Sequence, residues 1–225
     1  MARPIGLVRA VVIIVSSAYA VLIFVLGFDL PPWWRVLVSM FPILAAGFVM
    51  AWDLWIWRWP GIIRLFRRPD LRGLWRVTLT PHEDSAIPEG GNWGPVVAYL
   101  EVRQTFWSIH LKLYTLQSSS RSTGFSWINT PENEVDCLSY IYDGMPKISE
   151  TSFITRNIGV GTLAPTSLKP TQIEGRYFTD RPTKGDLVME FVDRSSGYPS
   201  FNAADRYADS IRASQEAVQE STSSH

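Results

Sequence analysis

Two apolar stretches open the chain, and a region with regular alternation of apolar and polar positions follows them. The stretches Ala10–Phe28 and Val36–Trp57 are separated only by the short segment Asp29–Arg35, and Asp53 is the single charged residue within either stretch. A bilayer core about 30 Å thick is crossed by about 20 apolar residues in a helix. The pattern therefore predicts a membrane α-hairpin of two transmembrane helices within residues 1–59.

The first stretch also has features of a secretory signal peptide. Arg9 precedes it, and Ala18-Tyr19-Ala20 has the form of a cleavage site. The apolar run continues past Ala20, however, and the second stretch follows at once, so we expect both stretches to stay in the mature chain. Asp53 has two possible roles. It contributes to helix–helix association inside the membrane, or it lies at the membrane–water interface near Arg58.

Basic residues predict the orientation of the hairpin. Arginines flank its two outer ends, whereas the connecting segment has only Arg35, beside Asp29. The positive-inside rule then places both ends in the cytoplasm and the connecting segment outside. The arginines between Arg58 and Arg72 also fit contact with anionic lipid.

Alternation of apolar and polar positions predicts eight β-strands after a basic connector over residues 60–70. No helical segment interrupts them, so we expect an all-β domain over residues 71–192, an eight-stranded antiparallel up-and-down barrel whose closure leaves no exposed sheet edge. The strands are expected at about Gly73–Thr80, Val96–Gln104, Ser108–Gln117, Ser122–Ile128, Val135–Tyr142, Phe153–Leu163, Gln172–Thr179 and Asp186–Val192.

The last part of the chain, residues 193–225, is a polar tail. We expect a loop over Asp193–Asn202, a modest amphipathic helix over Ala203–Glu220 and disorder from Ser221 onward. Its few apolar anchors are Tyr207, Ile211 and Val218. A tail that buries so little is more typical of a flexible extension than of a partner-binding element.

Charge and composition exclude several function classes. The net charge is zero, which argues against a binder of nucleic acid polymers. Cys137 is the only cysteine, so no intramolecular disulfide is expected, and the three histidines lack the spacing of a metal site. No P-loop or hydrolase motif occurs, and no nucleophile–base pair lies in the polar clusters described next. We therefore expect a binding protein and not an enzyme.

Two polar clusters are candidate sites for an anionic ligand. Ser118–Thr123 combines hydroxyls with a guanidinium, which donate strong hydrogen bonds to phosphate. Gly175–Gly185 adds further donors, and its Tyr177 and Phe178 are able to stack on a base. Both clusters also fit polar hairpin turns, because serine runs and Asp-Arg-Pro segments are typical of turns.

Several short segments together point to a known family. They are Pro69–Trp75, Gln104–Trp107, Ser118–Ser122, Tyr140–Tyr142 and Glu174–Arg181 with Gly185. With the paired apolar stretches before them, these segments resemble the two-transmembrane, β-barrel effectors of bacterial CBASS anti-phage defence, which are encoded beside a CD-NTase nucleotidyltransferase. The resemblance extends through Val192.

This resemblance implies a cytoplasmic barrel that binds a cyclic dinucleotide made by the partner CD-NTase after infection. The activating nucleotide is the only small molecule it calls for, and binding drives oligomerisation, disruption of the bacterial inner membrane and abortive infection. Trp75 and Trp107 fit either base stacking or core packing. The positions carried over as ligand contacts are Ser120, Arg121, Ser122, Tyr142, Tyr177, Thr179 and Arg181.

Two other functions stay open on the sequence. One is a membrane-anchored, lipocalin-like binder of an apolar small ligand, and the other is a structural membrane anchor that recruits a partner through the tail. A barrel interior rich in arginine, serine and tyrosine favours the nucleotide, whereas an aliphatic interior favours the apolar ligand.

Overall fold

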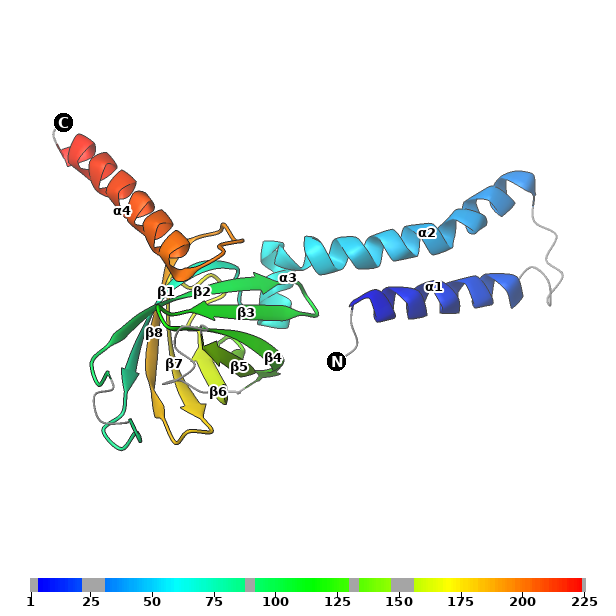
Figure 1. Cartoon of the computed structure of the whole chain (residues 1–225). Helices are drawn as coiled ribbons and strands as arrows, with labels where there is room; N and C mark the ends of the chain where they lie inside the picture. Colours follow the sequence, from blue (N-terminus) through cyan, green and yellow to red (C-terminus); the bar gives the residue numbers. More distant parts are fainter. Residues whose placement is uncertain (1–3, 22–30, 88–91, 130–133, 147–155, 224–225) are drawn as a thin grey trace. The chain divides into compact units, whose positions relative to one another are not determined.

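The computed structural model describes residues 4–21, 31–87, 92–129, 134–146 and 156–223 (Figure 1). The chain divides into two compact units. The first comprises Met1–Ile63 together with Thr105–Ser108, and the second comprises Arg64–Gln104 with Ile109–His225. The split near residue 63 falls inside the predicted connector.

Helices make up most of the first unit. They are α1 (Pro4–Ala20), α2 (Pro32–Leu54), the short 3-10 helix η2 (Ile56–Arg58) and the start of α3 (Pro60–Phe66). Pro32 and Pro60 stand at the first positions of α2 and α3, where the missing backbone N–H has no intrahelical acceptor to lose. The connector expected over residues 60–70 therefore contains the helix α3, which the pattern did not predict.

The expected membrane hairpin corresponds to α1 and α2. In the described part of the chain, no helix combines the length and the apolar character that crossing a bilayer requires. Residues 22–28 of the first predicted span lie outside the described ranges. The transmembrane hairpin stays a prediction from the sequence.

Asp53 occupies a specific position in the first unit. Its side chain is buried, and its carboxylate accepts a hydrogen bond of 3.2 Å from the backbone N–H of Trp107. The backbone N–H of Phe106 donates to the Asp53 carbonyl at 3.1 Å, and the Phe106 ring packs edge-on against Trp52 with centroids 5.7 Å apart. Asp53 therefore holds the segment 105–108 against the end of α2, a role that neither sequence interpretation included.

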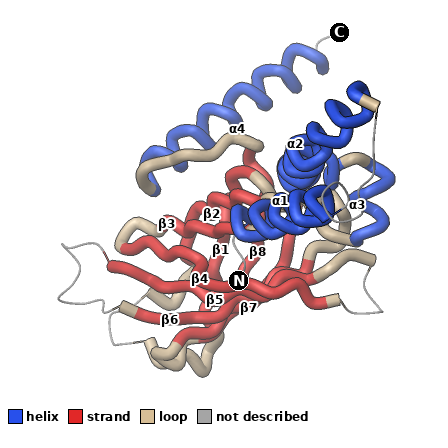
Figure 2. The backbone as a smooth tube through the Cα atoms, turned by 90° about the vertical axis from the view of Figure 1, so that its right-hand side faces the viewer, coloured by secondary structure: helices blue, strands red, loops and turns tan. Residues whose placement is uncertain are grey.

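A closed barrel of eight antiparallel strands forms the second unit (Figure 2). Each strand pairs with its neighbours in sequence, and β1 pairs with β8 to close the sheet, so the predicted fold class is confirmed for this domain. The strands are β1 (Gly73–Pro81), β2 (Val96–Gln104), β3 (Ile109–Tyr114), β4 (Ser118–Ile128), β5 (Cys137–Pro146), β6 (Asn157–Ala164), β7 (Gln172–Thr179) and β8 (Lys184–Asp193).

The strand bounds differ from the prediction mainly in the third to sixth strands, and the fifth ends at Pro146 instead of Tyr142. The third strand ends at Tyr114, and the serine run belongs to β4 instead of to a turn. The sixth strand begins at Asn157, while residues 153–155 of the predicted strand lie outside the described ranges. Elsewhere the bounds agree within a few residues, because alternation identifies half-buried strands well.

One end of the barrel is filled by apolar side chains. Trp75 is fully buried there and donates from its indole nitrogen to the Leu71 carbonyl at 2.8 Å. Buried Gln104 accepts from the Leu71 N–H at 2.8 Å and donates to the Pro69 carbonyl at 2.9 Å. These bonds satisfy the backbone of the entering segment, which would otherwise bury unpaired polar groups. Trp75 therefore serves the core.

Arginines in and just after the connector have partners within the second unit. Arg67 donates to the Glu134 carbonyl at 3.1 Å, and the Arg68 guanidinium lies 5.3 Å from the centroid of the Trp127 ring. Arg72 binds both carboxylate oxygens of Asp70 at 2.8 Å. Contacts within the protein thus account for three of the arginines that the sequence analysis associated with lipid.

The tail forms the helix α4 (Phe201–Ser223), whose first half packs on the outside of the barrel. Phe201, Ala204 and Ala208 are buried against Leu74 and neighbouring tyrosines. The second half extends past the strands (Figure 1). Of the predicted anchors, Tyr207 and Ile211 are half-buried, and Val218 lies outside the described side chains.

Candidate functional site

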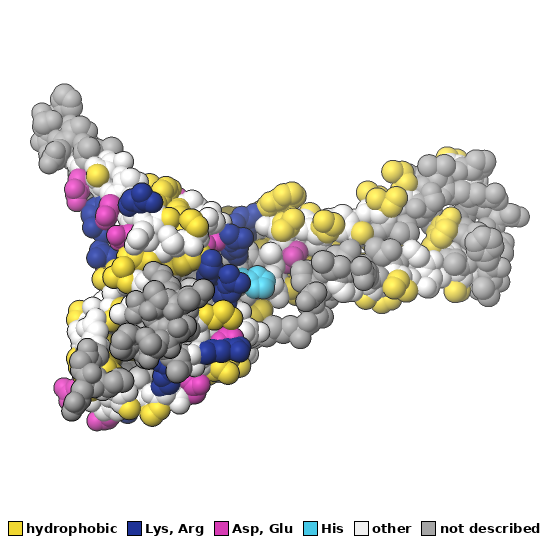
Figure 3. Space-filling model, in the orientation of Figure 1, with side chains coloured by type: hydrophobic (Ala, Val, Ile, Leu, Met, Phe, Trp, Pro, Cys, Tyr) yellow, Lys and Arg dark blue, Asp and Glu magenta, His cyan; other side chains and the backbone are white. Residues whose placement is uncertain are grey.

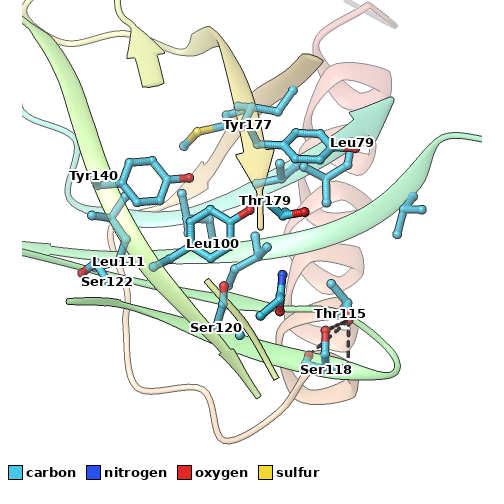
Figure 4. A pocket seen from close by; sticks show the side chains of 18 residues that line it. Leu79, Leu100, Leu111, Thr115, Ser118, Ser120, Ser122, Tyr140, Tyr177 and Thr179 are labelled. Atoms are coloured by element: carbon cyan, nitrogen blue, oxygen red, sulfur yellow. Dashed lines mark hydrogen bonds between the residues drawn. The ribbon is translucent and has the colours of Figure 1, made fainter. Parts of the chain in front are cut away.

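A cavity of about 200 Å³ lies inside the barrel (Figure 4). Because side chains alternate along each strand, every second residue contributes to its wall. Part of the wall is aliphatic and comes mainly from β1, β2, β3 and β8. The remainder is mostly polar or aromatic and comes from β4, β5, β6 and β7 and from the β3–β4 turn. The lining residues are Val77, Leu79, Val96, Leu100, Leu111, Leu113, Thr115, Ser118, Ser120, Ser122, Tyr140, Tyr142, Gly144, Asn157, Tyr177, Thr179, Leu187 and Met189.

The cavity reaches the barrel end opposite Trp75. Thr115 and Ser118 flank the β3–β4 turn, and their side chains are joined by a hydrogen bond of 2.9 Å between the hydroxyls. Gly144 and Asn157 stand at the facing ends of β5 and β6, and Thr179 ends β7. Small and polar side chains therefore surround this end, whereas the other end is filled by the core.

The serines of β4 form a row along one wall. Ser118, Ser120 and Ser122 line the cavity, and Figure 4 shows them spaced along it, with Ser122 beside Leu111 and Ser118 beside Thr115. The Ser122 hydroxyl accepts a hydrogen bond of 2.9 Å from the Leu111 N–H. In the described part of the chain, the Ser120 hydroxyl has no hydrogen-bond partner. Ser120 is therefore the member of the row with a donor and an acceptor available to a ligand.

Three tyrosines provide the aromatic part of the wall. The rings of Tyr140 and Tyr142 lie 5.9 Å apart on β5, and Tyr177 lies on β7. Burial raises the pKa of Tyr142 to about 12, and it also raises the pKa values of Tyr140 and Tyr177. All three keep their protons at neutral pH. Among the described residues none of the three hydroxyls has a hydrogen-bond partner, so each remains a potential donor toward the cavity.

Glycines on the neighbouring strands make room for these rings. Tyr140 pairs with Gly161 and Tyr142 pairs with Gly159 across the sheet, and a Cβ atom at either glycine would collide with the ring of its tyrosine partner. The spacing of Gly159 and Gly161, at two successive inward positions of β6, is the sequence signal for the tyrosine wall.

Arg181 lies in the turn between β7 and β8. Its backbone N–H donates to the Thr179 hydroxyl at 3.3 Å. The side chain is half-buried, and its Nε and Nη2 atoms are buried without a hydrogen-bond partner in the described part of the chain. A buried guanidinium that lacks an acceptor is costly unless an anion binds it. These two nitrogens are therefore donors available to an anion, two residues from the cavity wall.

The other predicted site residues lie elsewhere. Arg121 stands between two inward-facing serines, so the strand pleat directs it outward, where it is exposed. It lines a hollow on the outer surface of β2–β4 with Arg103, His110 and Lys112, on a face where Lys and Arg side chains gather (Figure 3). Trp107 belongs to the first unit.

Five of the seven predicted contacts thus line one cavity, and two do not. Those five are Ser120, Ser122, Tyr142, Tyr177 and Thr179. Sequence reasoning did not select Tyr140 or Asn157, although Tyr140 lies two positions from Tyr142 and shares its face. The described residues contain no group of three potential metal ligands.

Comparison with known proteins identifies the barrel. A family model described as Cap15, cyclic dinucleotide receptor domain, matches residues 66–190, from the end of α3 into β8. This match covers more than half of the chain. A search of curated proteins finds no match to the sequence.

Proposed function

Since the chain belongs to the Cap15 cyclic dinucleotide receptor family, and is thereby a CBASS effector that senses a cyclic dinucleotide, we propose that the barrel cavity is the nucleotide site. The observation that carries this proposal is the composition of the cavity wall. Three tyrosine hydroxyls and Ser120 face a space that also has an aliphatic wall. A cyclic dinucleotide presents two bases and two phosphates, and this wall offers surfaces for both.

The tyrosines and Arg181 have complementary roles in this proposal. Aromatic rings stack on nucleobases, and hydroxyl and guanidinium groups donate charge-assisted hydrogen bonds to phosphate. The cavity of about 200 Å³ is smaller than the ~300–1,000 Å³ of most ligand pockets. One base therefore enters between the tyrosines, while the phosphates stay at the open end near the turn that carries Arg181.

The composition of the cavity wall is typical of a site that binds a ligand without catalysing a reaction. Its described residues include hydroxyls and an amide but no histidine, carboxylate or amine that would activate a nucleophile. We therefore propose a receptor and not an enzyme, with the cyclic dinucleotide as its only small-molecule partner.

For the first unit we propose a two-helix anchor in the bacterial inner membrane, with the N-terminus and barrel in the cytoplasm. The support is the apolar run Ala10–Phe28, the second run Val36–Trp57 and the arginines outside them. A ligand shifts assembly only if it binds one assembly state better than the other. Nucleotide-bound copies then oligomerise, and the clustered hairpins disrupt the membrane, which ends the infected cell before phage mature.

The test of the nucleotide site compares two arginines. The full chain in detergent micelles is titrated by calorimetry with cyclic di-GMP, cyclic di-AMP, cyclic GMP–AMP, cyclic di-UMP and cyclic trinucleotides. We expect one of them to bind, and Arg181→Ala to weaken it about tenfold or more, the usual effect of losing a hydrogen bond to a charged group. Arg121→Ala is the matched control and keeps wild-type affinity, because its side chain faces away from the cavity.

Two results would contradict the proposal. If no nucleotide in the panel binds the folded protein but a fatty acid does, the aliphatic part of the wall serves an apolar ligand. If Arg121→Ala weakens binding and Arg181→Ala does not, the nucleotide occupies the outer hollow.

The membrane step has its own readout. The full chain is reconstituted in vesicles of phosphatidylethanolamine and phosphatidylglycerol that contain a fluorescent dye. We expect dye release on addition of the nucleotide that binds, at a higher nucleotide concentration for Arg181→Ala. Nucleotide binding without release would separate the receptor from the membrane-disrupting activity.

A further inference from the structure

An apolar row crosses the outer face of the barrel on strands β5, β6 and β7, which lie side by side (Figure 2). Val160 on β6 pairs with Ile141 on one side and with Phe178 on the other. These side chains are 39%, 47% and 49% exposed, and Ile158, the next outward residue of β6, is 53% exposed. A contiguous exposed apolar patch of this kind commonly marks an interaction site.

A positive and a negative side chain flank this row, so the surface is electrostatically complementary to the same surface of a second copy. Arg176 and Phe178 point to the same side of β7, because they alternate with inward residues, and both are exposed. Asp180 follows the end of β7 and is also exposed. Its backbone N–H donates to the Ile158 carbonyl at 2.9 Å, which continues the β6–β7 pairing by one residue pair. The cation and the anion thus stand two residues before and two residues after the aromatic ring. Arg176 has only a loose ion pair with Asp186, at 3.7 Å between largely exposed side chains.

A two-fold axis at Val160 that runs parallel to the sheet and perpendicular to the strands places this surface of one copy against the same surface of another. In that arrangement Arg176 of one copy faces Asp180 of the other, and symmetry repeats the pair. An apolar centre with a charged rim is the usual composition of a protein–protein interface. We infer that the outer face of β5–β7 is a self-association surface, occupied by the same face of a second copy of this chain.

The position of the surface connects it to the cavity. Gly159 and Gly161 on either side of Val160 face inward, where the rings of Tyr142 and Tyr140 lie over them. A ligand that moves these rings acts on the strand whose outer side carries Val160. The inference rests on the proposed ligand-driven assembly and names the surface through which the barrels meet.

The first test is a cross-link at the proposed symmetry axis. The full chain with Cys137→Ser and Val160→Cys is treated in detergent micelles with a short bis-maleimide, with and without each cyclic dinucleotide of the panel above. We expect a covalent dimer. The control replaces Val160→Cys by Glu190→Cys, an exposed position on β8, and should give at least about fivefold less dimer even if the hairpins associate.

The second test exchanges the two charges. Arg176→Asp alone and Asp180→Arg alone each bring like charges together, and each should lower the association constant about threefold to tenfold, since exposed ion pairs contribute modestly. The double variant restores opposite charges and should return to the wild-type association constant. A double variant as weak as the single variants would overturn the arrangement.

Calorimetry on the same samples keeps the two proposals apart. Absence of the Val160→Cys dimer in all conditions overturns the surface, even where nucleotide binds. Formation of this dimer in a protein that binds no cyclic nucleotide supports the surface and overturns the proposed nucleotide site.

Discussion

The packing of Tyr140 and Tyr142 requires that two positions of β6 have no Cβ atom. Gly159 and Gly161 have no Cβ atom, and the Tyr142 and Tyr140 rings occupy the space that such atoms would fill. Packing of an aromatic ring over a cross-strand glycine also compensates for the weak strand preference of glycine. The two tyrosines and the two glycines are therefore one packing unit.

Gly161→Ala tests this unit. The added methyl group would collide with the Tyr140 ring, and we expect the free energy of unfolding to fall by about 1–3 kcal/mol, as for other overpacked sites. Thermal unfolding of the full chain in detergent, followed by tryptophan fluorescence, measures the change. Gly61→Ala is the control, because a Cβ atom there meets nothing within 4 Å. Equal unfolding temperatures in the two variants would contradict the packing described.

The protonation of Tyr142 predicts an alkaline instability. Burial, with smaller contributions from Tyr177 and Asp180, raises its pKa to about 12 from the ordinary 10.0. Between these values the unfolded chain loses the proton and the native state keeps it, so the free energy of unfolding falls as pH rises from about 10 to 12. Below pH 10 this contribution is constant.

The measurement compares the wild type with Tyr142→Phe from pH 8 to pH 12. We expect the unfolding temperature of the variant to decline less steeply above pH 10, because the group that titrates is gone. Some decline should remain, since burial also raises the pKa of Tyr177. Parallel curves for the two proteins would show that Tyr142 is not protected from ionisation.

When ligand contacts are carried over from a similar family onto a β-strand, the strand pleat limits how many consecutive residues face the cavity. Ser120, Arg121 and Ser122 are consecutive, so the pleat directs them alternately inward and outward and at most two face the cavity. The sequence allowed both phases, because the serine run has no apolar residue that marks the inner side. The sequence likewise allows either face of the fifth strand to lie inside, and the closed barrel shows that the face of Leu138, Tyr140 and Tyr142 does.

Element boundaries were predictable where apolar residues alternate and were missed where they do not. β2 and β7 have the bounds predicted for them. β4 begins at Ser118, four residues before the prediction, because its serines face a cavity instead of a packed core. A similar reason explains why the helix predicted over Ala203–Glu220 was not expected to pack on the barrel. Among the described side chains of α4, two of the three buried ones belong to alanines, which carry little hydrophobic signal.

The docking of α4 is testable at those alanines. Ala204 is fully buried, so Ala204→Leu should push the helix off the barrel at a cost of about 1–3 kcal/mol. Limited trypsin digestion measures this through cleavage within the helix at Arg206 and Arg212, which should become faster. Ala213→Leu, at an exposed position of the same helix, should leave the rate unchanged. Equal rates in all three proteins would mean that the helix is not held there.

Hydrogen bonds to the barrel add to this docking. Tyr99 donates to Asp205 at 2.8 Å, and Tyr207 donates to Asp193 at 2.7 Å. Hydrogen bonds from Ser195 and Tyr207 lower the pKa of Asp193 to about 2. The first two turns of α4 are thus part of the folded unit, although the family match ends at residue 190.

Because the first two turns of α4 belong to the folded unit, a deletion that tests the tail has to leave these turns in place. Deletion of residues 193–225 would expose Leu74, Tyr99 and Tyr114, and should lower the unfolding temperature by more than about 4 °C. Deletion of residues 210–225 leaves the buried anchors in place and should shift it by less than about 2 °C.

The shorter deletion therefore separates two functions. If it keeps nucleotide binding and cell killing, recruitment of a partner through the end of the tail is contradicted. If killing is lost while nucleotide binding and stability stay at wild-type levels, the structural-anchor alternative gains support.

The glycine-backed tyrosines also have a consequence for engineering. Shortening Tyr142 to leucine or alanine would enlarge the cavity, because the facing glycine supplies no side chain that would collapse inward. The width of the chamber is thus adjustable one ring at a time. A biosensor built on this barrel would have its preference between small and large bases retuned at these positions, while the scaffold that reports binding stays the same.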